Sequence, residues 1–158
     1  LAVAPTKNIG RFEWFLEKAV EIGVDEITPL VCEHSERRHI RTDRLDKILI
    51  SAMKQSLKWS KPKLNDLIDL KTFIGNSSDE MRFIGYCSTE VTDHLFEKAC
   101  KDGRSVVLIG PEGDFSEREV GLAMKSGFVP ISLGSSRLRT ETAAVVACHV
   151  LNLVNEIK

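Results

Sequence analysis

Two glycine-rich loops hold the residues whose types and spacing best fit chemistry. Residues 110–115 read GPEGDF, and residues 134–142 read GSSRLRTET. Each loop follows a short apolar segment typical of a strand and precedes a helical pattern. In an open α/β sheet, ligands bind beyond the carboxyl ends of the strands, and glycine allows the backbone to approach a ligand closely. The two loops together are therefore a candidate ligand site.

The composition of these loops narrows the kind of ligand. Neither loop matches the phosphate-binding loop, which ends in Gly-Lys-Ser/Thr, or the G-x-G-x-x-G dinucleotide signature. Glu112 and Asp114 oppose a bare polyphosphate and suit a ligand with a cationic or hydroxyl-bearing part. Ordinary strand-to-helix turns give the same pattern in a single loop, but two such loops at one end of a sheet are harder to explain as turns alone.

Hydrophobic periodicity predicts the elements that position the loops. Helices are expected from residue 9 to 22, from 42 to near 61, from 91 to 100, from 116 to about 126 and from 140 to about 156. Strands are expected at residues 2–4, 26–32, 81–87, 105–110 and 129–133. Strands alternating with helices predict an α/β fold with a mostly parallel sheet and helices on both faces.

Several single residues predict where these helices and strands begin or end. Gly23 is expected to end the first helix, and Thr42 to cap the second, whose buried side includes Leu57. Ser116 and Glu119 have the spacing of a capping box. Pro29 implies that its strand lies at a sheet edge or carries a bulge, because proline donates no backbone hydrogen bond.

Composition sets the broad class of the protein. The 158 residues are 42% hydrophobic and 28% charged, which is typical of one folded domain. No apolar run reaches the roughly 20 residues of a membrane span, and no signal peptide is recognisable, so a cytoplasmic protein is expected. The four cysteines and four histidines are scattered. The spacing of the cysteines predicts small buried thiols rather than a disulfide framework. The spacing of the cysteines and histidines together predicts no metal site.

The charges are unevenly distributed along the chain. Residues 37–63 hold nine basic residues and two acids, a local balance of +7, against −8 in the remainder of a chain whose net charge is −1. A basic stripe of this kind indicates a surface that meets a phosphate backbone, and Trp59 within it is a candidate stacking surface for a base. A solvated helix face gives the same pattern.

Three segments resemble the signatures of one known family. In chain order they read KNIGRFEWFLEKAVEIGVDEITPL, LIGPEGDFSEREV and LGSSRLRTETAA. They are similar in order and spacing to the motifs of the ribosomal RNA small-subunit methyltransferase E family, and the resemblance covers essentially the whole chain. It implies a SPOUT-class methyltransferase with a C-terminal trefoil knot, S-adenosylmethionine as cofactor, a homodimer, and N3 methylation of a uridine in 16S ribosomal RNA or in the small ribosomal subunit.

The resemblance also implies cofactor-binding residues, and the chain departs from the family in two respects. The cofactor is expected to lie largely against backbone groups of Leu108, Ile109, Gly110, Pro111, Glu112, Gly113, Ile131, Ser132, Leu133, Gly134, Leu138, Arg139 and Thr140. The common form of the family has a glycine where this chain has Asp114. Family members usually carry an N-terminal PUA-like RNA-binding domain, which we expect to be absent, so that residues 1–158 are the methyltransferase domain alone.

The implied reaction predicts catalytic roles. Uracil N3 must lose its proton, which leaves negative charge on the flanking carbonyl oxygens. Arg139, or Arg11 in the first helix, is expected to stabilise that charge through paired hydrogen bonds. Glu112 or Glu141 is expected to accept the proton or to contact the cofactor instead.

The RNA-binding residues are expected in the basic stripe. Arg37, Arg38 and Arg41 are expected to bind phosphates, and Gln55 either reads the uracil edge or is a solvated polar residue of its helix. Two other functions fit the same sequence: an RNA-binding module that keeps the fold without catalysis, and a nucleotide-binding α/β enzyme of different chemistry. The second is disfavoured because no phosphate-binding lysine lies near residues 110–113.

Overall fold

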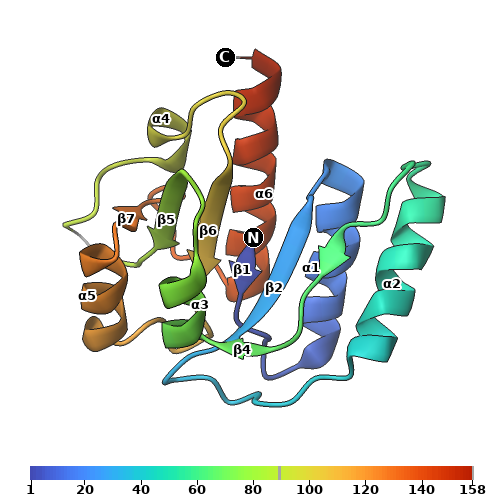
Figure 1. Ribbon diagram of the computed structural model, residues 1–158, viewed down its shortest axis with the longest axis horizontal. Coiled ribbons are helices and arrows are strands. Elements are labelled where there is room, and N and C mark those ends of the chain that lie inside the picture. The colour runs from blue at the N-terminus through green and yellow to red at the C-terminus, as the bar shows by residue number, and fades with distance from the viewer. Residues whose placement is uncertain (89, 158) are drawn as a thin grey trace.

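The computed structural model describes residues 1–88 and 90–157, and in this part of the chain seven strands form one parallel sheet (Figure 1). The strands are β1 (Ala2–Val3), β2 (Glu26–Val31), β3 (Lys63–Leu64), β4 (Ile68–Asp69), β5 (Met81–Gly85), β6 (Ser105–Ile109) and β7 (Val129–Ile131). The helices are α1 (Ile9–Ile22), α2 (Thr42–Gln55), α3 (Leu70–Asn76), α4 (Leu95–Lys98), α5 (Glu117–Lys125) and α6 (Thr140–Ile157).

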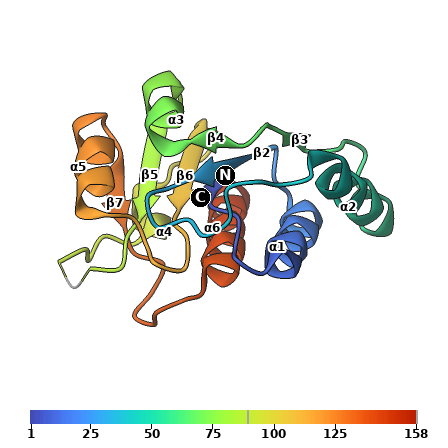
Figure 2. The same ribbon diagram turned by 90° about the horizontal axis from the view of Figure 1, so that it is seen from below.

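The strand order is β3-β2-β1-β6-β5-β7, and β4 pairs with β2 beyond the end of β3. Every pairing of these strands is parallel. Figure 2 shows α3 and α5 on one side of the sheet and α1 and α6 on the other. The predicted α/β class, with a mostly parallel sheet and helices on both faces, is confirmed.

Strand β6 lies at the centre of the sheet and supplies both of its faces. Val107 and Ile109 are buried in the apolar cluster with α1 and α6, whereas Val106 and Leu108 are buried in the cluster with α3 and α5. Successive side chains of a strand point to opposite faces, so a strand covered on both sides needs the continuous apolar run that residues 106–109 provide.

Helices α1 and α6 pack side by side beneath the sheet. Gly23 ends α1 at a φ of 126°, as predicted, because a left-handed backbone costs glycine little. The Asn152 side chain of α6 donates a 2.7 Å hydrogen bond to the Gly23 carbonyl and closes this helix end. The predicted capping box of α5 is also present: the Ser116 hydroxyl accepts from the Glu119 N–H, and the Glu119 carboxylate accepts from the Ser116 N–H.

The prediction for Pro29 was wrong. Its strand, β2, is paired on both sides, with β1 on one side and with β3 and β4 on the other. Residues 26–27 of β2 pair with β3, and residues 30–31 pair with β4. Proline is tolerated because it lies opposite the interval between β3 and β4, where no partner strand requires its missing N–H.

The boundaries of α2 also differ from the prediction. Arg41, rather than Thr42, occupies the N-cap, and its side chain makes no capping hydrogen bond. The helix ends at Gln55, and Leu57 adopts a φ of 55° and is 85% exposed instead of buried. Residues 63–76, for which no element was predicted, form β3, β4 and α3.

Other expectations hold only in part. The helix expected at residues 91–100 shrinks to α4, and the strands expected at 81–87 and 129–133 end at Gly85 and Ile131. Two of the four cysteines, Cys87 and Cys100, are exposed, against the prediction of buried thiols. Within the described residues, no helix combines the length and the apolar character needed to cross a membrane.

Candidate cofactor site

Three loops meet where β5, β6 and β7 end. These strands are neighbours in the parallel sheet, so their carboxyl ends lie at one edge. The predicted loops after β6 and β7 are joined there by the segment that follows β5, which the sequence analysis missed. Its position after a buried strand was the one signal that pointed to it.

A buried hydrogen bond connects the two predicted loops. The Thr140 hydroxyl, at the start of α6, donates to the carbonyl oxygen of Gly110 at 3.0 Å. Thr140, Gly110 and Pro111 are all buried. The bond fixes the distance between the loop after β6 and the first turn of the last helix, which holds part of the candidate site in place without a ligand.

Ser132 and Asp114 fasten the third loop. The Ser132 N–H donates to the Asp93 carbonyl at 2.8 Å, and the Ser132 carbonyl accepts from the Leu95 N–H at 3.1 Å. Asp114 has a φ of 61°, and its carboxylate accepts from the N–H of Cys87 at 3.3 Å. Burial raises the pKa of the Cys87 thiol, and the nearby Asp114 charge raises it further.

The segment after β2 supports the loop after β6 from outside. Nδ1 of His34 lies 3.0 Å from the carbonyl oxygens of both Gly113 and Asp114. A Cβ on Gly113 would lie 3.0 Å from the His34 Cβ, so glycine permits this close approach. The Glu33 N–H donates to the Glu119 carboxylate at 2.8 Å. No spacing in the sequence signalled these contacts.

Glu112 has a structural partner. Its Oε1 accepts a 2.9 Å hydrogen bond from the backbone N–H of Lys7, which links the loop after β6 to the loop after β1. Arg37 holds the same loop from the other side: its guanidinium donates to the carbonyl oxygens of Thr6 at 3.0 Å and Lys7 at 2.6 Å. Arg37 is therefore engaged with backbone that is connected to the candidate site.

Arg11 and Glu141 are brought together, as the prediction of a shared site requires. Nε of Arg11 lies 3.8 Å from Oε1 of Glu141, whose side chain is only 9% exposed. Within the described residues, the other oxygen, Oε2, is buried and accepts no hydrogen bond. The first turn of α6 leaves backbone N–H groups that favour a negative charge at this place. An unsatisfied buried acceptor needs a donor or a cation.

The other predicted cofactor-binding residues line the same edge. Leu108, Ile109 and Ile131 are buried at the strand ends, Ser132, Leu133 and Leu138 are half-buried, and Glu112, Gly113, Gly134 and Arg139 are exposed. Gly134 has a φ of 125°, and a Cβ there would meet no atom within 4 Å. The loop after β7 thus presents open backbone next to the buried strand ends.

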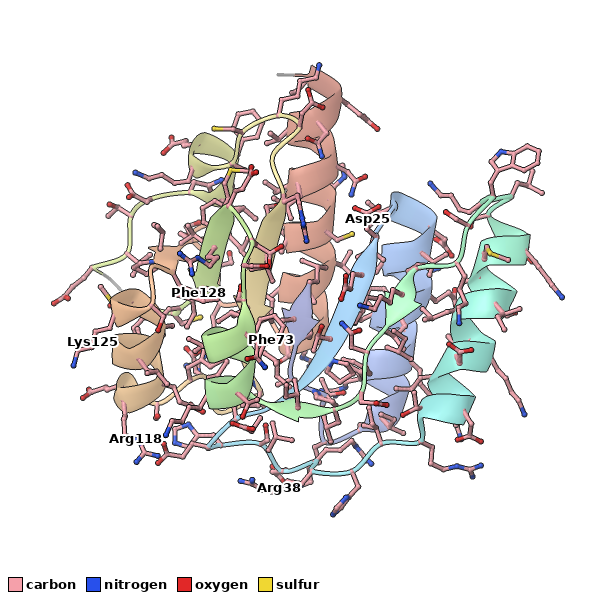
Figure 3. The ribbon with its side chains drawn as sticks, in the orientation of Figure 1. Asp25, Arg38, Phe73, Arg118, Lys125 and Phe128 are labelled. Carbon is pink, nitrogen blue, oxygen red and sulfur yellow. The ribbon has the colours of Figure 1, made fainter. Side chains whose placement is uncertain are left out.

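The predicted RNA-binding residues are split between two ends of α2. Arg37, Arg38 and Arg41 precede the helix, and Arg38 lies on the loop at the lower edge in Figure 3. Gln55 is the last residue of α2, about 20 Å away along the helix axis. Gln55 is therefore not brought together with the other three.

Comparison with known proteins decides the family. Residues 1–152 match the sequence family described as RNA methyltransferase domain. The chain belongs to this RNA methyltransferase family. A curated relative from Mesomycoplasma hyopneumoniae, named ribosomal RNA small subunit methyltransferase E, is 31% identical over 151 residues, which is 92% of this chain and 64% of the relative. The Buchnera aphidicola (Acyrthosiphon pisum) relative of that name is 33% identical. The match covers 89% of this chain and 58% of the relative.

Solved structures agree with the sequence family. A probable rRNA-methyltransferase from Porphyromonas gingivalis has a TM-score of 0.92 and 47% identity, over 98% of this chain and 66% of that one. The ribosomal RNA small subunit methyltransferase E of Neisseria gonorrhoeae, bound to S-adenosyl methionine, has a TM-score of 0.87 and 28% identity, over 96% and 64% of the two chains. The chain thus spans about two thirds or less of the length of these members of the RNA methyltransferase family.

Proposed function

We propose that this chain is the methyltransferase domain of an enzyme that methylates N3 of a uridine in 16S ribosomal RNA, with S-adenosylmethionine as the methyl donor. The observation that carries the proposal is the meeting of three loops at the ends of β5, β6 and β7, of which those after β6 and β7 are joined by the Thr140–Gly110 hydrogen bond. Relatives in this family are named ribosomal RNA small subunit methyltransferase E, and the structure from Neisseria gonorrhoeae is bound to S-adenosyl methionine.

The residues at the loops fit this cofactor. S-adenosylmethionine carries a positive sulfonium and amino group, hydroxyls, and no polyphosphate. The unsatisfied Oε2 of Glu141 is an acceptor suited to such a cationic or hydroxyl donor. Gly134 leaves room beside the loop after β7, whereas Gly110 and Gly113 let the loop after β6 pack closely against Phe115 and His34. The buried strand ends offer an apolar surface to a planar base.

The cofactor, when bound, supplies a methyl group already activated by its sulfonium. The protein then has to orient the uracil and remove the N3 proton. The exposed guanidinium of Arg139, beside Thr140, is free to stabilise charge on the uracil oxygens. Arg11 holds Oε1 of Glu141, and we infer that Oε2 accepts the proton or a cofactor donor. Glu112 is the weaker candidate because it already accepts from Lys7.

The proposal includes the SPOUT class and a trefoil knot. Two observations support the knot: Ser132 is held between Asp93 and Leu95, and Thr140 then bonds to Gly110 at the centre of the sheet. The last segment thus contacts the loop after β5 at Ser132 and the loop after β6 at Thr140. The proposal also includes a homodimer, which would cover apolar surface such as that of Trp14, 45% exposed on α1. A cytoplasmic location follows from the ribosomal substrate.

Calorimetric titration tests the cofactor. We expect stoichiometric, micromolar binding of S-adenosylmethionine and S-adenosylhomocysteine and none of ATP. Absence of binding to a folded protein would contradict the proposal. Transfer of a labelled methyl group to 16S RNA, followed by nuclease digestion, then tests the product: N3-methyluridine is expected, and another methylated nucleoside would refute the assigned position.

A further inference from the structure

Helix α2 presents a basic face to solvent along its whole length. Arg44, Lys47, Ser51, Lys54 and Gln55 are all exposed and recur at intervals of three and four residues, which places them on one side of the helix. The opposite side of α2 is buried against α1 through Leu45, Leu49 and Ala52. The exposed face, about 20 Å long, is called here the α2 track.

Two lysines of the α2 track form no ion pair within the described residues, although the charge of Lys47 helps to lower the pKa of Asp43. Arg41 is 3.0 Å from Asp43, and Arg44 forms a two-point ion pair with Glu13. In contrast, among the described residues, no carboxylate lies within ion-pair distance of Lys47 or Lys54. Packing does not require either lysine, because both are exposed. Unpaired cations in a row favour a polyanion as the partner.

Two shallow hollows lie beside the α2 track. One hollow of about 320 Å³ runs from Arg41 to Ser51, and a second of about 200 Å³ reaches Arg37 and Ile9. Arg41 and Arg44 line both hollows, while Asp43 lines the first and Glu13 the second. Arg37 contacts the carbonyl of Lys7, and the N–H of Lys7 contacts Glu112 in the loop after β6. Arg37, which lines the second hollow, is thus two hydrogen bonds away from the loop after β6.

A fully exposed indole lies just beyond the C-terminal end of α2. Trp59 is 102% exposed, four residues beyond the end of α2. A tryptophan without burial contributes no packing, and leaving its ring in water is unfavourable. The π-face of an indole next to lysines is, however, a surface on which any unpaired base stacks.

We propose that the α2 track binds the phosphate backbone of single-stranded RNA and that Trp59 stacks on an unpaired base at its end. The proposal rests on the proposed function, because it assumes an RNA substrate at the loops. RNA is favoured over a protein partner because lysines are depleted from protein interfaces, whereas phosphate contacts draw on them.

Tryptophan fluorescence tests the stacking directly. The chain has two tryptophans, so Trp14→Phe leaves Trp59 as the only one. Titration of this variant with a short single-stranded oligouridine RNA is expected to quench the emission. Trp59→Ala is expected to weaken binding by at least about fivefold, as measured by anisotropy of a labelled RNA. Unchanged emission and affinity would overturn the role of Trp59.

Salt dependence tests the track. Lys47→Ala/Lys54→Ala is expected to weaken RNA binding and to reduce the slope of log K against log salt by about 1.4, for two lost phosphate contacts. The matched control is Lys71→Ala/Lys125→Ala on α3 and α5, two helices that lie apart from α2 (Figure 1), which should leave the slope unchanged. If both double variants gave the same slope of log K against log salt, the proposal that the α2 track binds RNA phosphates would be overturned.

The cofactor titration separates this inference from the proposed function. Cofactor binding together with an unaffected RNA affinity of the α2 variants would refute the track alone. RNA binding through α2 without any cofactor binding would support the track and refute the methyltransferase. A protein that binds no RNA, but whose Trp59→Ala variant changes oligomeric mass in solution, would show that the surface binds a second copy, and this overturns the proposal.

Discussion

The hydroxyl of Thr140 donates a buried 3.0 Å hydrogen bond to the carbonyl oxygen of Gly110, thirty residues earlier in the chain. This contact joins the first turn of the last helix to the loop after the central strand. Replacing Thr140 with valine keeps the shape and leaves a buried carbonyl without its partner. We expect a loss of about 1–3 kcal/mol in the free energy of unfolding, measured in urea, and weaker binding of S-adenosylmethionine.

Thr142→Val is the matched control, since it makes the same change two residues along the same helix, at a half-buried site. Thr142→Val is expected to lower the free energy of unfolding by less than Thr140→Val does, and to leave the affinity for S-adenosylmethionine unchanged. If both variants weakened the cofactor equally, the Thr140–Gly110 bond would not be what positions the loops.

Arg139 is expected to act on the uracil rather than on the cofactor. Arg139→Ala should lower the single-turnover rate of methyl transfer by at least about 10²-fold, because a charge stabiliser of the transition state is lost. Cofactor affinity should change little. Arg137→Ala, at an equally exposed position of the same loop, should retain the rate. A folded Arg139→Ala protein with the normal rate would remove Arg139 from the mechanism.

The cysteines are expected to differ in reactivity. Burial raises the pKa of Cys32 to about 12 and that of Cys148 to about 11, so neither forms the reactive thiolate in the native state. Iodoacetamide should label the exposed Cys87 and Cys100 first. Mass spectrometry of digested protein measures each site. S-adenosylhomocysteine should slow labelling of Cys87, next to Asp114, and not of Cys100; equal protection of both would argue against the proposed site.

Asp69 gives the stability of the protein a pH dependence. Hydrogen bonds from the Thr72 hydroxyl and N–H lower the pKa of this N-cap carboxyl below its usual 3.8. The native state then binds the proton less readily than the unfolded chain, so the stabilisation is present above about pH 4 and is lost as pH falls through the lowered pKa. Asn also caps helices but does not titrate. The stability advantage of the wild type over Asp69→Asn should therefore shrink between about pH 7 and about pH 3.

Urea unfolding at several pH values measures this difference. Thr72→Val removes the hydroxyl donor, so its free energy of unfolding should also fall less than that of the wild type as the pH is lowered. Parallel pH profiles for the wild type and Asp69→Asn would show that the carboxylate of Asp69 contributes no linkage.

Leu57 is expected to be a strained position. A φ of 55° places leucine in the left-handed region, where a Cβ is crowded, and the side chain is 85% exposed. Leu57→Asn should stabilise the protein by about 0.5–1 kcal/mol, because asparagine tolerates this conformation. Ile50→Asn, at an exposed position inside α2, should give no gain, since asparagine is a poor helix former. Denaturant midpoints of the two variants decide the matter.

Features set by neighbouring residues were predictable from the sequence. The capping box of Ser116 and Glu119, the end of α1 at Gly23 and the apolar run of β6 were all confirmed, because each depends on contacts within a few residues or on a local pattern. The two glycine-rich loops could be located for the same reason. Parallel strands place their carboxyl ends at one edge, so the sequence also indicated that these loops meet.

Features that depend on distant partners were decided by the tertiary structure alone. Pro29 fits an inner strand because β3 ends before β4 begins, and nothing near Pro29 in the sequence encodes that interval. His34 supports Gly113 across seventy-nine residues, and Arg37 is engaged by backbone carbonyls thirty residues away. A residue pattern records which side chains a segment carries; the partners that satisfy a carbonyl, a guanidinium or a buried carboxylate such as Glu141 exist only once the chain has closed on itself.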